Sequence, residues 1–90
     1  MFTRITHIKK DRDIVVEVGA IEDGHVTWRA PVSEAIRRYR AGVRYFVQLP
    51  DGSYSEVVVE PGGFYTEPLL RTVADRVFDR KLLKLPEFYS

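Results

Sequence analysis

The sequence predicts an α+β fold: a small antiparallel β-sheet of about five or six short strands with one short α-helix packed on it. Segments 14–20 and 43–49 have an apolar residue at every second position, which is typical of half-buried strands. Between them, apolar residues recur every three to four positions over 32–43, the spacing of an amphipathic helix. Asp-Gly at 23–24 and Pro-Asp-Gly at 50–52 favour chain reversals. The expected order is β-β-(β)-α-β-β-β.

Size and composition limit the classes of protein to consider. Residues 1–90 are expected to form a single domain, because a chain this short supports only one hydrophobic core. Cysteine is absent, which excludes disulfides, thiolate catalysis and sulfur-ligated metals. Apolar runs reach only three residues, whereas a membrane span needs about 20, so a cytoplasmic protein without a membrane partner is expected. The net charge of +1 does not favour an obligate nucleic-acid binder.

The first third of the chain is expected to form a hairpin. Residues 2–10 are dense in strand formers, 10–13 form a polar turn, and a second strand follows. One face of that second strand is expected to carry Ile14, Val16, Val18 and Ala20. After the Asp-Gly turn, His25–Arg29 is expected as the optional third strand, with Trp28 anchoring the core.

A helix of about nine residues is expected next. Pro31 ends the preceding strand, and Ser33 is a suitable N-cap because its hydroxyl can accept a hydrogen bond from a free N–H of the first turn. Gly42 can end the helix in the left-handed conformation. The predicted apolar stripe consists of Val32, Ala35, Ile36, Tyr39 and Val43.

The second half begins with the clearest predicted hairpin, which joins 43–49 to 54–61 through Pro-Asp-Gly. Beyond the glycines at 62–63, the sequence is ambiguous. Apolar residues within 69–78 fit a helical stripe, but the same stretch is also rich in strand formers after a glycine turn. Periodicity alone leaves both structures open.

The order of the pieces resembles a family of small bacterial domains of unknown function. Such chains have an opening "V..I.KD" strand, a tryptophan ahead of a helix that ends "I..G", then "YYV", a valine-rich strand and "LRT.AD…DNLL.LP". The matching stretches here are Ile5–Asp11, Trp28, Ser33–Val47, Val57–Val59 and Leu70–Phe88. The resemblance implies a final strand at about Leu69–Ala74, a turn, and a single helical turn near Arg80–Leu83. It implies a fold but no activity.

Basic residues form the first candidate site. Arg37, Arg38, Arg40 and Arg44 could form a phosphate-binding face, with Arg29, Lys9, Lys10 and Arg12 as extensions. The alternative is a solvated helix face, because Glu34 is spaced to pair with Arg37 and Arg38. The balanced overall charge favours this second interpretation.

Aromatic residues form the second candidate. A stacking platform for single-stranded nucleic acid would use exposed rings from the set Tyr39, Tyr45, Phe46, Tyr54, Phe64 and Tyr65. Strand alternation places Tyr45 and Phe46 on opposite faces, so the two cannot share one platform. We therefore expect these rings to pack in the core of so small a domain.

The remaining polar residues predict no chemistry. His7 and His25 lack a metal-ligand spacing, and the serines lie at caps, turns or the end of the sequence. The candidate carboxylates for catalysis, each of which would act with a histidine, are Asp51, Glu56, Glu60, Asp75 and Asp79. They need a cleft that a domain of this size seldom has. No enzyme activity, cofactor or metal is therefore expected.

With these functions excluded, we expect the chain to be a small bacterial interaction or accessory domain without catalytic activity. Its partner would be another protein or a second copy of the chain. The last nine residues offer an apolar set that either closes the core, which is favoured, or forms a partner patch: Leu82, Leu85, Phe88 and Tyr89. The alternative function is weak, non-specific nucleic-acid binding through the helix arginines.

Overall fold

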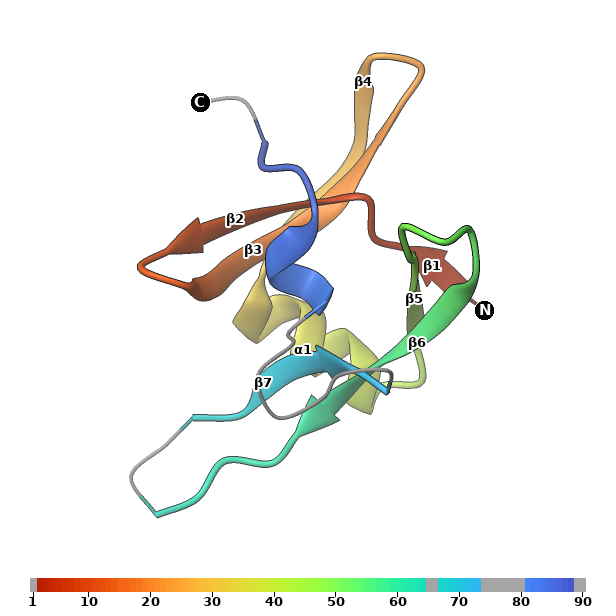
Figure 1. Ribbon diagram of the computed structural model, residues 1–90. Coiled ribbons are helices and arrows are strands. Elements are labelled where there is room, and N and C mark those ends of the chain that lie inside the picture. Colours follow the sequence, from red (N-terminus) through yellow and green to blue (C-terminus); the bar gives the residue numbers. More distant parts are fainter. Residues whose placement is uncertain (1, 65–66, 74–80, 89–90) are drawn as a thin grey trace.

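The α+β prediction is confirmed by a computed structural model, which describes residues 2–64, 67–73 and 81–88 (Figure 1). Within these residues, seven short strands, one α-helix and one 3-10 turn follow one another along the chain. The strands are β1 (Phe2–Arg4), β2 (His7–Asp11), β3 (Ile14–Glu22), β4 (His25–Pro31), β5 (Arg44–Gln48), β6 (Tyr54–Glu60) and β7 (Leu69–Thr72). The helix is α1 (Val32–Arg40), and the 3-10 turn is η1 (Lys81–Lys84).

The strands are divided between two sheets. One sheet has the order β1-β5-β6-β7, with β1 parallel to β5 and the other pairs antiparallel, and the other is the antiparallel meander β2-β3-β4. The single strand expected over 2–10 is therefore split in two. At the split, Ile5 N donates to Phe46 O (2.9 Å) in the first sheet, and Thr6 N donates to Gly19 O (2.9 Å) in the second. The chain thus crosses from one sheet to the other within two residues.

Both hairpins of the three-stranded sheet use two-residue turns. Asp23 and Gly24 both have positive φ (52° and 79°), as the Asp-Gly pair predicts for a type I′ turn. The prediction for the inward face of β3 is correct for Val18 and Ala20. It is wrong for Ile14, which is exposed, and for Val16, which is half-buried and does not pack against the core cluster. A β-bulge causes this difference: Lys9 pairs with Glu17 but Lys10 pairs with Val15, so the alternation shifts by one residue and Val15 packs against the core.

Helix α1 has the predicted length and C-terminus but a different N-terminus. Strand β4 runs directly into the helix, Pro31 occupies the N-cap position, and Ser33 lies inside the first turn without capping it. The expected Ser33 cap is therefore wrong. Gly42 has φ 112° and, with Val43, closes a Schellman motif: Val43 N donates to Arg38 O and Gly42 N to Tyr39 O (both 3.0 Å).

The two sheets and α1 enclose the core. Tyr45 lies at its centre, only 1% exposed, and donates its hydroxyl hydrogen bond to Ala35 O (3.1 Å). Trp28 stacks on the Tyr45 ring at 5.7 Å and donates its indole N–H to Arg4 O (3.1 Å), so its predicted anchoring role is confirmed. The buried cluster comprises Ile5, Ile8, Val18, Ala35, Ile36, Tyr45, Val47, Val57, Leu70 and Leu82.

The C-terminal region contains a strand and then a short helical turn, as the resemblance implied. Strand β7 pairs with β6, and η1 follows, while residues 74–80 lie outside the described part of the chain. The segment after η1 runs beside β2 (Figure 1): Ile8 N donates to Pro86 O (3.0 Å), and Phe88 N donates to Ile8 O (2.9 Å). Among the described residues, α1 and η1 are both too short to span a bilayer.

Candidate functional site

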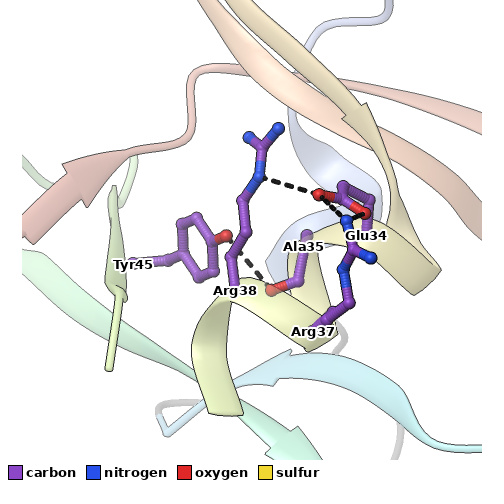
Figure 2. Close-up of polar contacts among 5 residues, drawn as sticks. All are labelled: Glu34, Ala35, Arg37, Arg38 and Tyr45. Carbon is purple, nitrogen blue, oxygen red and sulfur yellow. Dashed lines mark hydrogen bonds and ion pairs between the residues drawn. The ribbon is translucent and has the colours of Figure 1, made fainter. Parts of the chain in front are cut away.

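The helix arginines are partly neutralised by their own neighbour (Figure 2). Arg37 Nη2 lies 2.6 Å from one Glu34 oxygen and donates to the other at 2.7 Å, and Arg38 Nε donates to Glu34 at 3.3 Å. The Arg37 hydrogen bond holds the pKa of Glu34 below its ordinary value, so this carboxylate stays charged near neutral pH. Glu34 therefore offsets one of the two guanidinium charges.

The other members of the predicted arginine set lie elsewhere. Arg44 is on β5, half-buried, with its guanidinium 4.7 Å over the Tyr39 ring and a hydrogen bond to Tyr39 O (3.3 Å). Arg40 is exposed and borders an apolar groove. The proposed extension Arg29 forms an ion pair with Glu17 (2.9 Å). The structure thus places these cations at separate points, most of them with a partner.

Three aromatic side chains instead form a row across the four-stranded sheet, on the face turned away from the core. We call Phe2, Phe46 and Tyr54 the aromatic row. Phe46 contacts the other two edge to face, with ring centroids 6.4 Å from Phe2 and 5.6 Å from Tyr54. Phe2 is 65% exposed and Tyr54 62% exposed. The expectation that the aromatic residues pack in the core is confirmed for Tyr45 and Tyr39, and it is wrong for Tyr54 and for Phe64, which is 99% exposed. Tyr65 lies outside the described residues.

Strand register explains this row. Tyr45 and Val47 of β5 point inward, so Phe46 between them points outward. Tyr54 is the register partner of Gln48, on the same outer face. The alternation around Phe46 could have indicated that pair from the sequence, whereas Phe2 reaches the row only through the parallel pairing of β1 with β5.

A cation-lined pocket adjoins one end of the row. It has a volume of about 480 Å³ and is lined in part by Arg4, Lys81 and Lys84, which we call the cation pocket. Arg4 donates to Gln48 Oε1 (2.8 Å), while its Nε is buried without a hydrogen-bond partner among the described residues. The described residues that line this pocket include no carboxylate. Three cations suit an anion, and the charge of Lys81 also acts on Asp51, which lies between the lining residues Pro50 and Gly52.

The residues of the predicted partner patch serve the interior of the domain. Leu82 and Phe88 are buried, Leu85 packs half-buried against the core, and Tyr89 lies outside the described residues. In the described structure these three side chains close the core, which was the favoured alternative.

A second hollow, of about 830 Å³, lies between β3, the start of α1 and β7. Apolar side chains such as Val15, Ile36 and Leu69 account for most of its lining. Its polar lining residues are Asp13, Ser33, Arg40 and Glu67.

The candidate residues for catalysis or metal binding that the structure describes lie in turns and strands, where some of them form local hydrogen bonds. His7 Nδ1 shares a hydrogen bond with Thr6 Oγ1 (2.8 Å), and His25 begins β4 after the Asp-Gly turn. Asp51 accepts hydrogen bonds from the Ser53 hydroxyl (2.6 Å) and backbone N–H (2.9 Å), which lower the pKa of Asp51 and fix the β5–β6 turn. In the described ranges, no three His, Cys, Asp or Glu side chains gather in a metal-binding arrangement.

No protein-family model, curated protein or solved structure matches the chain. The resemblance to the family of small bacterial domains therefore stays a prediction.

Proposed function

We propose that this chain is a non-catalytic interaction domain that binds its partner through the outer face of the four-stranded sheet. The observation that carries the proposal is the aromatic row, in which two rings are each about two-thirds exposed. Large apolar side chains that gather on one exposed surface are typical of binding sites, whereas single scattered ones are not.

Energetics support a functional reason for the row. Burying a large apolar side chain contributes about 1.5–3 kcal/mol, and a domain of this size depends on such contributions. Phe2 and Tyr54 leave much of that stabilisation unused. A partner that covers the rings would recover it at the interface.

Site-specific photo-crosslinking tests this surface. A benzophenone amino acid replaces Tyr54, and in a matched control it replaces Val26, which is also exposed but lies on β4 of the other sheet. In extracts of the source cells, we expect a discrete macromolecular adduct from position 54 and none from position 26. The proposal fails if position 54 gives no adduct, or if both positions give the same pattern.

A further inference from the structure

Two surfaces of different chemistry meet at Arg4. Its Cα is the register partner of Phe46, at the centre of the aromatic row, and its side chain also lines the cation pocket. Arg4 donates to Gln48, whose register partner is Tyr54 and which itself borders the pocket. Flat apolar rings and clustered cations are therefore adjacent parts of one surface.

The aromatic row suits unpaired bases. Exposed aromatic side chains on a sheet bind single strands because every base has a π-face that can stack on them, whatever the sequence. Ring centroids follow one another at 6.4 and 5.6 Å, and both outer rings are mostly exposed. A duplex keeps its bases stacked on one another, so it cannot offer these faces.

The cation pocket suits phosphate. Three cationic side chains, Arg4, Lys81 and Lys84, are among its lining residues, and none of its described lining residues is a carboxylate. Glu56 pairs with Phe46 from the opposite side, on β6. Arg4 attracts phosphates on one side of Phe46, and Glu56 repels them on the other. Phosphates are therefore favoured at the pocket, and the bases can lie on the rings.

We infer that this surface binds single-stranded nucleic acid, with bases stacked on the aromatic row and phosphates held at the cation pocket. The inference rests on the proposed function, since it uses the same sheet face and names its partner. It assigns phosphate contacts to Arg4 and its pocket rather than to the helix arginines.

Fluorescence anisotropy with a labelled thymidine oligonucleotide tests the inference. At low salt we expect a Kd on the order of 1–100 µM, and clearly weaker binding to a duplex of equal length. Tyr54→Ser and Phe2→Ser each remove one stacking ring, and each should weaken binding by roughly 5- to 150-fold. Val26→Ser is the matched control, exposed on the other sheet, and should leave binding unchanged. Circular dichroism verifies that each variant is folded.

Salt dependence separates the two surfaces. Arg4→Gln should reduce the slope of log affinity against log salt by about 0.7, the contribution of one phosphate contact on a single strand. Tyr54→Ser should leave that slope unchanged while lowering the affinity. A merely structural defect would lower the affinity of both variants without changing the salt slope in one and leaving it unchanged in the other.

The outcomes distinguish the inference from the proposed function. Absence of oligonucleotide binding, equal binding of duplex, or indifference to Tyr54→Ser would overturn the inference. If position 54 then still crosslinks to a protein, the interaction surface stands and only its partner is different. If neither oligonucleotide binding nor a crosslink is found, both proposals fail.

Discussion

The two faces of the β5–β6 hairpin carry similar residues in opposite environments. Tyr45 and Phe46 are neighbours in sequence, yet Tyr45 is 1% exposed at the centre of the core and Phe46 lies on the outer face between two largely exposed rings. Aromatic content tells how much apolar surface the chain carries, but strand alternation decides which face receives it. In this domain, the inner face forms the core, and the outer face carries two largely exposed rings.

The same contrast applies to the arginines. Arg37 and Arg38 are conspicuous in the sequence, but both contact Glu34 (Figure 2). Arg4 stands alone in the sequence, yet it lies in a pocket with two lysines. A cluster of charged residues in the sequence is therefore a poorer guide to a binding site than the contacts that each charged side chain forms in the fold.

The largest expected difference between the two faces is in stability. Tyr45→Ala should lower the free energy of unfolding by about 3–5 kcal/mol, because it leaves a cavity in the core. Tyr54→Ala on the outer face should change it by about 1 kcal/mol or less. Urea unfolding measures both. A similar loss in the two variants would contradict the division between the faces.

A smaller effect concerns alkaline pH. Burial raises the pKa of Tyr45 above the ordinary value for tyrosine, since the interior disfavours the phenolate. This contribution to stability is therefore fully present below about pH 10 and is lost as pH rises through the higher pKa of the folded state. Thermal unfolding at about pH 9 and pH 11 should show the loss.

Tyr45→Phe removes the ionisable hydroxyl, so its stability should fall less over the same pH range. It also leaves Ala35 O without the tyrosine donor, at a cost of about 1–2 kcal/mol at neutral pH. Tyr54→Phe is the exposed control. An equal alkaline loss in the Tyr45→Phe variant and the unmodified protein would show that Tyr45 is not its source.

The smallest effect is expected at the helix arginines. If the sheet face binds the oligonucleotide, the double variant Arg37→Ala, Arg38→Ala should change the Kd by no more than about twofold through lost long-range attraction. Anisotropy measures this directly, with Arg4→Gln as the comparison. If the double variant lost salt-sensitive binding and Arg4→Gln kept it, the phosphate contacts would be made by the helix arginines and not by the cation pocket.

The sequence predicts local structure well wherever one face is buried against the core. The β5–β6 hairpin, the stripe of α1 and the Gly42 terminus follow from alternation, helical spacing and turn chemistry. The division into two sheets could not be predicted, because it depends on a crossover at Ile5–Thr6 that has no local signal. The β-bulge that exposes Ile14 likewise has no recognisable signal in the local sequence.

The candidate site is harder to predict than the fold. The aromatic row draws its members from β1, β5 and β6, and the cation pocket joins Arg4 to two lysines almost eighty positions away. Parallel pairing and long-range packing bring these residues together. Neither depends on a spacing that periodicity detects. The alternation that places Phe46 outward was the one usable signal.

The pairing of β2 with residues 86–88 also sets the timing of folding during synthesis. Strand β2 is translated well before its outer neighbour at 86–88 and before the core side chain Leu82. The nascent chain must therefore keep an open sheet edge until residues 82–88 have been translated. Ribosome stalling shortly before residue 82 would prolong exposure of that edge, and this interval is when chaperone capture is most useful.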